Sequence, residues 1–324
     1  MAGIGLGFVG YGIMGERLLR AALAHDPAVL RPVGVWDPSP EAMARLAATF
    51  PEVRPFEGPE ALVAASDCVY VASPPASHLD HAAAILAAGK AAFLEKPLAV
   101  DVAAAERLVA DAAGARAAVN FPFASSLGVA QLGTWLEEGA VGPVGSLRIE
   151  VAFAHWPRPW QMDAAGWLAR RAQGGFTREV VSHFLFLARR RLGPLTLLAH
   201  DVEYPDGDGD GSEEVIAATL TAGTVPVRLS GRVGGTDKPD HNLWVLEGAA
   251  GAIRLRDWSV AERRQPDGTW REAADAMANE QARPLVLKRQ LDAVAAMARG
   301  EAHPLATLGE ALDVQRVVER ILAG

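Results

Sequence analysis

Hydrophobic and polar positions follow one repeating pattern over the first 120 residues. Short apolar runs, typical of strands, alternate with alanine-rich stretches, typical of helices. The predicted strands cover 4–9, 32–36, 68–72, 91–94 and 116–119. The predicted helices cover 13–24, 40–50, 59–65, 79–89 and 102–113. Strands that are apolar on both faces and alternate with helices form a parallel sheet covered on both sides, so residues 1–120 predict a doubly wound α/β domain of the Rossmann type.

The pattern changes after residue 120. Longer segments of β-type composition predict strands over 146–156, 195–204, 214–222, 225–234, 243–247 and 252–258. Helices are predicted over 126–138, 177–191, 284–299 and 307–322. Runs of strands with segregated helices are typical of α+β domains. Residues 121–324 therefore predict a second, substrate-binding and oligomerisation domain on a mostly antiparallel sheet.

Composition narrows the class of protein. A length of 324 residues fits two domains, and a formal net charge of −8 argues against a nucleic-acid partner. No apolar run is long enough to cross a membrane, and the N-terminus lacks the features of a secretion signal, so we expect a cytoplasmic protein. The one cysteine, Cys68, lies in an apolar run and is expected to be buried. No Cys/His cluster has zinc spacing. Residues 206–211 imitate a calcium loop, but its twelfth position is Ala217 instead of glutamate, so a hairpin loop without metal is predicted.

A glycine-rich turn carries the first chemical signal. Two registers of G-x-G-x-x-G are present, and only the later one leaves a full strand before it and a helix after it. Its residues are Gly10, Tyr11, Gly12, Ile13, Met14 and Gly15. Such a turn holds the pyrophosphate of a dinucleotide on the N-terminus of the following helix. Gly10 permits the tight turn, Gly12 the approach of the phosphates, and Gly15 close packing of helix and strand.

The second predicted strand ends at Asp37, 22 residues after Gly15. A carboxylate at this place accepts hydrogen bonds from the adenosine ribose hydroxyls and repels the additional phosphate of NADP. No arginine follows it directly, since the next residues are Pro38, Ser39 and Pro40. We therefore expect NAD, with NADP less favoured.

The fourth predicted strand runs into Glu95, Lys96 and Pro97. A lysine at the carboxyl end of a parallel strand points into the crevice where such sheets bind ligands. The proline permits a cis peptide bond, which would hold the lysine in one orientation. Taken by itself, this tripeptide favours an ordinary surface turn.

Taken together, these motifs resemble the Gfo/Idh/MocA family of glucose-fructose oxidoreductase, inositol 2-dehydrogenase and the rhizopine-catabolism oxidoreductases. Four pieces occur in the family's order: the glycine turn with Asp37, the segment 72–78 (ASPPASH), Glu95-Lys96-Pro97, and the segment 174–183 (GGFTREVVSH). The 137–142 turn and the terminal helices are also similar, so the resemblance covers nearly the whole chain.

The resemblance implies roles for individual residues. Ser73, Pro74, Pro75 and His78 would line the nicotinamide ribose. Glu95 and Lys96 would lie by the nicotinamide, with Lys96 reaching the reacting substrate oxygen. Asn120, at the end of the last parallel strand, would face the substrate.

The segment 174–183 carries a candidate catalytic pair. The family usually has an aspartate and, four residues later, a histidine; here these are Glu179 and His183. A spacing of four places both side chains on one helical face. The pKa of an ordinary imidazole, near 6.5, suits proton transfer around neutrality, so His183 is the candidate general acid/base. Glu179 would orient the imidazole or hold a substrate hydroxyl, and its longer side chain puts the family's substrate contacts in question.

A tryptophan-rich loop follows the first strand of the second domain. Trp156 and Trp160 offer aromatic faces for a sugar ring, or alternatively fill a domain or oligomer interface. Arg158 and Arg170 are candidates for contacting a substrate carboxylate or phosphate.

The sequence thus predicts an NAD(P)-dependent oxidoreductase that transfers a hydride between nicotinamide and a sugar, sugar derivative or cyclitol. A homodimer or homotetramer is expected from the resemblance. Two alternatives stay open: a non-catalytic dinucleotide-binding sensor, and a lyase, hydrolase or epimerase that recycles NAD.

Overall fold

The computed structural model describes residues 3–205 and 209–323. The chain forms two compact units. The first comprises the residues through Ala124 together with Pro284–Leu312, and the second comprises Ser125–Arg283 and the residues from Asp313 onward. Each unit is described by itself below.

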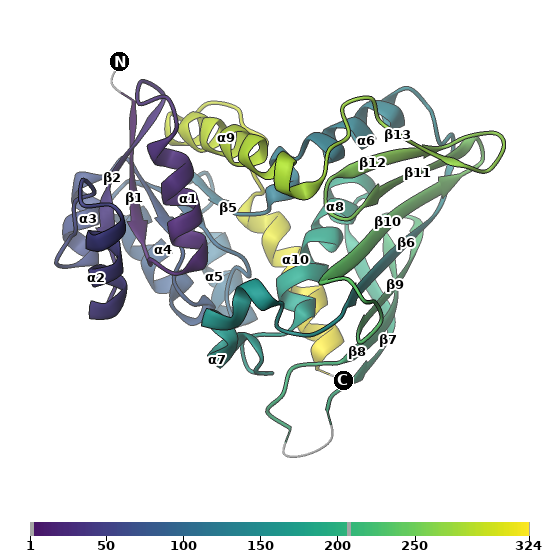
Figure 1. Ribbon diagram of the computed structural model, residues 1–324, viewed down its shortest axis with the longest axis horizontal. Helices are drawn as coiled ribbons and strands as arrows, with labels where there is room; N and C mark the ends of the chain where they lie inside the picture. Colours follow the sequence, from purple (N-terminus) through teal and green to yellow (C-terminus); the bar gives the residue numbers. More distant parts are fainter. Residues whose placement is uncertain (1–2, 206–208, 324) are drawn as a thin grey trace. The chain divides into compact units, whose positions relative to one another are not determined.

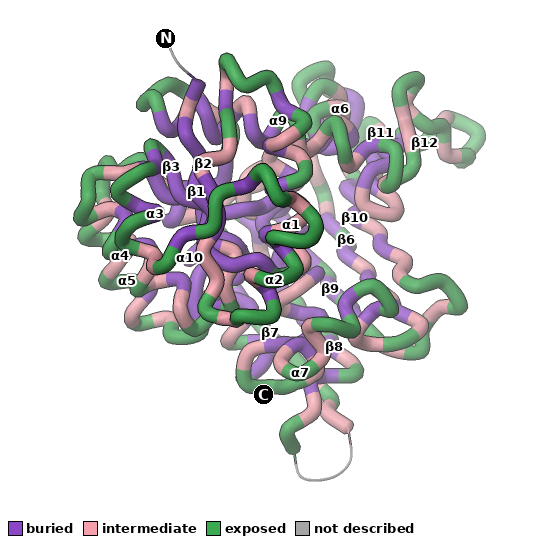
Figure 2. Tube along the Cα trace, turned by 60° about the vertical axis from the view of Figure 1, so that its left-hand side comes forward, coloured by how far each residue is buried: buried purple, intermediate pink, exposed green. Residues whose placement is uncertain are grey.

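The first unit contains a parallel sheet of five strands in the order β2-β1-β3-β4-β5. The strands are β1 (Ile4–Val9), β2 (Leu30–Trp36), β3 (Cys68–Val71), β4 (Ala91–Leu94) and β5 (Ala117–Val119). Every residue of β3 and β4 is buried, as Figure 2 shows for β3. This burial is the reason for their unbroken apolar composition, and the predicted doubly wound Rossmann sheet is confirmed.

Helices cover both faces of this sheet (Figure 1). They are α1 (Ile13–Leu23), α2 (Pro40–Thr49), α3 (Pro59–Ala65), α4 (His78–Ala87) and α5 (Val102–Asp111). The starts of α2 and α5 are fixed by side-chain caps: Ser39 accepts from the Ala42 N–H, and Asp101 accepts from the Ala104 N–H. The predicted boundaries agree with these helices to within two residues.

A segment from late in the chain completes the first unit. Helix α9 (Asn279–Ala298) contributes Leu291, Val294 and Met297 to the core that also contains Phe8. The Val119 N–H of β5 donates to the Ala306 carbonyl. The predicted division into 1–120 and an uninterrupted 121–324 differs from this arrangement, because an apolar helix face can be buried against any sheet within reach, irrespective of its place in the sequence.

The second unit is built on a sheet of eight strands in the order β13-β12-β11-β10-β6-β9-β8-β7. The strands are β6 (Val144–Phe153), β7 (Leu195–Glu203), β8 (Val215–Ala222), β9 (Val225–Val233), β10 (Asp240–Gly248), β11 (Gly251–Arg256), β12 (Val260–Arg264) and β13 (Trp270–Glu272). Only β6 and β9 pair in parallel. The predicted mostly antiparallel sheet is confirmed, although β12 and β13 were not predicted.

Helices lie on one face of this sheet, where α6 (Leu127–Glu137) and α8 (Ser182–Leu192) are seen in Figure 1. Helix α10 (Leu308–Leu322) begins in the first unit and ends in the second. Residues of β9 alternate between buried and exposed along the strand. Leu198 on β7 is 62% exposed. One face of the sheet therefore forms the core and the other is open.

Three further sequence expectations concern Cys68, the loop at 206–211 and membrane-spanning helices. Cys68 is fully buried, and burial raises the pKa of its thiol to about 12, as expected for a packed, unreactive cysteine. The loop at 206–211 lies partly outside the described residues, which omit 206–208. None of the helices in the described part of the chain is long and apolar enough to cross a membrane.

Candidate active site

The predicted cofactor residues follow the carboxyl ends of the parallel strands. Along the sheet, Asp37 follows β2, the glycine turn follows β1, Ser73 comes shortly after β3, Glu95 and Lys96 follow β4, and Asn120 follows β5. Because all five strands run in the same direction, these residues lie at one edge of the sheet. Ligands bind at this edge in open α/β sheets.

The glycine turn has the geometry that a bound pyrophosphate requires. Gly10 has a φ of 95°, which strongly favours glycine, and a Cβ on Gly15 would lie 2.1 Å from the Gly10 carbonyl oxygen. A Cβ on Gly12 would meet no described atom within 4 Å. Helix α1 begins directly after Gly12, and no side chain caps its start. The turn therefore fits a dinucleotide: two glycines close it, and the third leaves open space in front of an uncapped helix N-terminus.

Asp37 is tied to this turn. Its Oδ2 accepts the Tyr11 N–H at 2.7 Å, and its Oδ1 accepts the Ser39 N–H at 2.8 Å. These bonds hold the carboxylate beside the glycine turn while each oxygen keeps a lone pair for a ligand. Arg45 also reaches the turn, because its guanidinium donates to the Tyr11 carbonyl at 2.8 Å. Arg45 lies eight residues beyond Asp37, so inspection of the residues directly after Asp37 did not find it.

His78 connects the ends of two strands. Its Nε2 lies 2.7 Å from the Ser73 carbonyl oxygen, and its Nδ1 lies 2.9 Å from the Pro97 carbonyl oxygen. Burial lowers the pKa of His78, so the neutral ring is favoured, and it can donate to only one of the two carbonyls at a time. The ring thus holds the segment of Ser73, Pro74 and Pro75 next to the Lys96-Pro97 bond, which is cis as the sequence suggested.

Glu95 belongs to a buried polar cluster that also binds the backbone of Lys96. Its Oε1 accepts from the Tyr70 hydroxyl and, at 2.5 Å, from the Asn120 amide, while its Oε2 accepts the Lys96 N–H at 3.2 Å. Burial, and then the Glu95 charge, raise the pKa of Tyr70 well above 10, so its hydroxyl stays protonated and keeps donating. The side-chain Oδ1 of Asn120 in turn accepts from the Gln290 amide at 2.6 Å.

This cluster explains the place of Asn120, which is 2% exposed. Its side-chain amide is engaged by Glu95 and Gln290, so the structure places Asn120 in the interior as a support for Glu95. A substrate contact by Asn120 stays a prediction. Gln290 comes from α9, 170 residues further along the chain, and sequence spacing gave no sign of it.

In the second unit, the helix carrying Glu179 and His183 begins with a π-helical turn, Thr177–Val181, and continues as α8. Glu213 satisfies a backbone N–H at the start of this helix, because its Oε1 accepts the Thr177 N–H at 2.6 Å. Gly175, with a φ of 98°, lies so close to Glu213 that a Cβ would be 2.2 Å from the carboxylate. This requirement explains the second glycine of the 174–183 motif. Burial raises the pKa of Glu213, which the sequence had not singled out.

Glu179 and His183 each contact a residue that the sequence had not singled out. The Gln161 amide donates to Glu179 Oε1 at 3.2 Å. The ring of His183, 7% exposed, meets the ring of Trp258 edge to face, with centroids 5.5 Å apart. Trp258 follows β11 in a turn, and no motif of the sequence indicated that it would approach His183.

The tryptophans of the predicted substrate loop differ in surroundings. Trp156 packs against Phe153 and Phe176, and its indole N–H donates to the Leu168 carbonyl at 3.3 Å. These contacts favour the interior-filling alternative for Trp156. Trp160 is 43% exposed, and one face lies on the Arg158 guanidinium at 4.8 Å. This exposure leaves the sugar-stacking interpretation of Trp160 open.

The two arginines proposed as substrate contacts are both paired with carboxylates of the protein. Arg158 is 5% exposed and bonds Asp240 at 2.8 Å, and Arg170 bonds Asp210 at 2.9 Å. For Arg158 in particular, its burial and its pairing make direct binding of a substrate anion unfavourable, because the buried guanidinium would have to give up its carboxylate partner.

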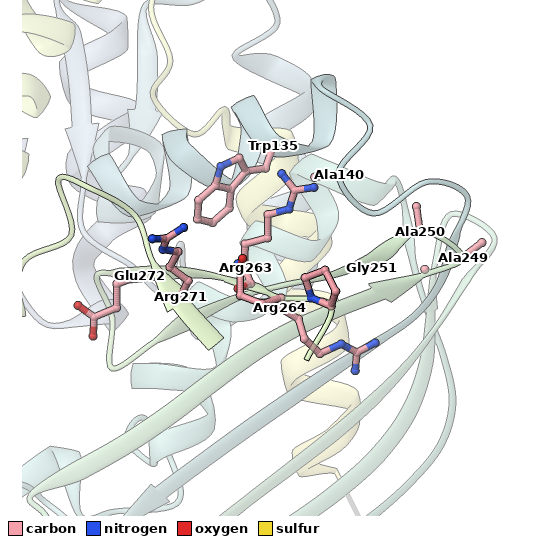
Figure 3. Close-up of a pocket in the computed structure, with 12 residues that line it drawn as sticks. Trp135, Ala140, Ala249, Ala250, Gly251, Arg263, Arg264, Arg271 and Glu272 are labelled. Atoms are coloured by element: carbon pink, nitrogen blue, oxygen red, sulfur yellow. The ribbon is translucent and has the colours of Figure 1, made fainter. Parts of the chain in front are cut away.

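A cavity of about 780 Å³ lies elsewhere in the second unit, between α6 and the β12–β13 hairpin. Figure 3 shows Trp135 between the side chains of Arg263 and Arg271, and none of the predicted site residues lines this cavity. Among residues 3–205 and 209–323, no group of three metal-binding side chains comes together.

The fold and the glycine turn define the first unit as a dinucleotide-binding Rossmann domain. Residues 4–121 match the family model described as "Oxidoreductase family, NAD-binding Rossmann fold" (GFO_IDH_MocA). Residues 4–121 therefore form an NAD-binding Rossmann domain of the Gfo/Idh/MocA oxidoreductase family, which confirms the resemblance over this domain. No curated protein matches the chain.

Solved structures share the fold over the full length. A levoglucosan dehydrogenase in complex with NADH and levoglucosan is 18% identical, with a TM-score of 0.83 over 99% of this chain and 96% of that one. An oxidoreductase from Agrobacterium radiobacter in complex with NAD+, L-tartaric acid and magnesium is 18% identical, with a TM-score of 0.82 over 99% and 96%. A UDP-N-acetylglucosamine 3-dehydrogenase from Acidithiobacillus ferrooxidans is 17% identical, with a TM-score of 0.77 over 100% and 98%.

Proposed function

We propose that this NAD-dependent oxidoreductase is a dehydrogenase or reductase of CH–OH groups, and that its substrate is a sugar, a sugar derivative or a cyclitol. The observation that carries the proposal is the order of groups along one edge of the parallel sheet. Asp37 and the glycine turn come first, then Ser73, and then Lys96 above the buried Glu95. This order suits a dinucleotide with its adenosine at Asp37 and its reactive ring at Lys96.

The proposed chemistry is oxidation of an alcohol, or the reverse. When bound, the nicotinamide accepts the hydride that leaves the carbinol carbon. The hydroxyl proton passes to the imidazole of His183 as the C=O bond forms. The Lys96 ammonium stabilises negative charge that develops on the same oxygen. Glu179 holds a substrate hydroxyl or orients the imidazole.

The substrate class rests on two supports. Structural relatives are described as levoglucosan and UDP-N-acetylglucosamine dehydrogenases, and one is in complex with NADH and L-sorbose. The half-exposed Trp160 supplies an aromatic face of the kind against which the C–H face of a sugar ring packs. We further propose that the protein is a cytoplasmic homodimer or homotetramer. Its subunits would pair through the open face of the eight-stranded sheet.

A substrate panel tests this function. Purified protein is mixed with sugars, cyclitols and sugar acids, each with NAD and with NADP, and absorbance at 340 nm is followed. We expect NADH to form with at least one neutral polyol. Cofactor binding without turnover of any compound would favour the non-catalytic sensor. Product formation without net NADH would favour a lyase, hydrolase or epimerase that recycles the cofactor.

We attribute the expected preference for NAD over NADP to the negative charge of Asp37. We expect Asp37→Asn to weaken NAD binding about tenfold or more, since a hydrogen bond to a charged group contributes about 1.5–3 kcal/mol. Affinity for NADP should rise at the same time, because repulsion of its additional phosphate is removed and Arg45 lies nearby. Titration of both cofactors by protein fluorescence measures the two changes.

Asp111→Asn is the matched control, because Asp111 is an exposed carboxylate at the end of α5. An unchanged ratio of NAD to NADP affinity in Asp37→Asn, with the control also unchanged, would contradict this assignment.

A further inference from the structure

A chain of buried polar contacts reaches Glu179 from the interior of the second unit. Arg158, which is 5% exposed, donates through Nε to Gln161 Oε1 at 2.8 Å. Gln161, 2% exposed, donates through its amide to Glu179 Oε1 at 3.2 Å. Because Gln161 accepts on one side and donates on the other, the guanidinium fixes the direction in which the amide faces the carboxylate.

A second branch leads from the same guanidinium to His183. Arg158 donates through Nη1 to Asp240 Oδ2 at 2.8 Å, and this oxygen also accepts the indole N–H of Trp258 at 3.3 Å. The indole in turn meets the His183 ring at 5.5 Å and 76°, and the Phe184 ring at 5.4 Å. The planar fork of one arginine thus connects both members of the candidate catalytic pair.

The backbone that carries Trp258 is held in an unfavourable conformation. Asp257 and Trp258 are the described non-glycine residues with positive φ, at 47° and 74°. The conformation persists because side chains fix it. The Trp258 N–H donates to Asn242 Oδ1 at 2.9 Å, and Asp257 Oδ1 lies 2.7 Å from His241 Nδ1. Strain of this kind in a folded protein is typical of functional positions.

We propose that Arg158, Gln161, Asp240 and Trp258 form one positioning network, in which the guanidinium fixes the Glu179 carboxylate through Gln161 and the His183 imidazole through Asp240 and Trp258. This inference rests on the proposed function of Glu179 and His183. The four residues act through the pair and do not contact the reacting atoms. The network also gives the buried charge of Arg158 a role in the site that needs no anionic substrate.

A purely structural role predicts a different pattern of effects. If the four residues only filled the interior, their replacement would lower stability and leave the orientation of the pair unchanged in the molecules that remain folded. If they position the pair, replacement lowers kcat in folded protein and changes the magnetic environment of the His183 ring. Removing Arg158 itself would leave Asp240 uncompensated and risks unfolding, so the test uses Gln161 and Trp258.

The test compares Gln161→Met, Trp258→Ala and Trp258→Phe in the full chain. For Gln161→Met and Trp258→Ala we expect kcat to fall about ten- to hundredfold, the range that a small misplacement of catalytic groups produces. The Kd for NAD should stay within about twofold, because the cofactor residues belong to the first unit. Trp258→Phe keeps an aromatic ring against His183 but loses the N–H that donates to Asp240, so we expect a smaller fall in kcat than in Trp258→Ala.

A second measurement needs no substrate. The imidazole C–H resonances of His183, assigned by their loss in His183→Gln, are recorded by NMR in the free protein. We expect them to shift in Trp258→Ala, because the ring current of the indole is removed, and to shift less in Trp258→Phe. Gln131→Met, the same change on α6 outside the network, is the control and should alter neither kcat nor these resonances.

The proposal is overturned if folded Gln161→Met keeps full kcat, or if the His183 resonances are the same in Trp258→Ala as in the unaltered protein. Failure of the proposed function has a different signature: the resonances would shift as expected while His183→Gln itself left turnover unchanged. If Trp258→Ala fails to fold, two other results test the proposal. They are the kcat of Gln161→Met and the shift of the His183 resonances between Trp258→Phe and the unaltered protein.

Discussion

Replacement of Lys96 by methionine is expected to lower kcat by about 100- to 1000-fold, the usual loss when one group that stabilises a developing oxyanion is removed. Methionine keeps most of the length of the side chain and removes its charge. Glu95 and its buried partners Tyr70 and Asn120 are untouched, so the strand end should keep its conformation. Replacement of His183 by glutamine should lower kcat by about 100- to 10,000-fold, because proton transfer to a positioned base is lost.

Steady-state kinetics with the substrate from the panel measure both effects. Lys90→Met is the matched control for the lysine, since Lys90 donates to the carbonyls of Ala64 and Ser66, at the end of α3 and just after it. His200→Gln, on the exposed part of β7, is the control for the histidine. Turnover within about threefold of the unaltered protein in either test variant would remove that residue from the catalytic machinery.

Replacement of Gly12 by valine should abolish dinucleotide binding while leaving the fold intact. Its Cβ would enter open space, and its φ of −81° is accessible to any residue. The added side chain would occupy the place predicted for the pyrophosphate, so we expect the Kd for NAD to rise by about 100-fold or more, equivalent to about 2.7 kcal/mol. The melting temperature of the free protein should stay nearly the same.

Gly15→Ala is expected to give the opposite result. Its Cβ would lie 2.1 Å from the Gly10 carbonyl oxygen, so helix α1 must move away from β1. Overpacking against rigid backbone should lower the free energy of unfolding by about 3 kcal/mol or more, measured by urea denaturation. Gly145→Val, at an exposed strand position with its nearest atom at 3.6 Å, is the control for both variants. NAD binding at unchanged strength in Gly12→Val would show that the dinucleotide does not use this turn.

The first unit shows how far local sequence determines structure. The strands β3 and β4 are buried on both faces, so their apolar runs are unbroken and their limits are readable. The glycine turn and Asp37 are close in sequence to the strands that carry them, and the Tyr11–Asp37 hydrogen bond joins consecutive strand ends. Because all strands of the unit are parallel, knowing where each strand ends was enough to place Asp37, Ser73 and Lys96 at one edge.

The second unit shows where local sequence stops being sufficient. Glu179 and His183 were found by their motif, but their neighbours Gln161 and Trp258 come from other elements and carry no recognisable spacing. Arg158 pairs with Asp240, 82 residues away, whereas the sequence had suggested that its guanidinium contacts a substrate anion. Which cation pairs with which carboxylate depends on distances that only packing creates.

The sequence alone was sufficient for the class of fold and for the positions of the glycine turn and of the acidic residue after β2, and it predicted Lys96 and His183 as candidate catalytic residues. Each of these inferences depends on short-range periodicity or on residues adjacent to a strand or helix end. Tertiary structure decided the rest. It assigned the 284–312 segment to the first unit, buried Asn120 against Glu95 and Gln290, and brought Arg158, Asp240 and Trp258 together around the motif helix. These contacts join residues far apart in the chain, and burial and pairing, which have no local signature, determine their chemistry.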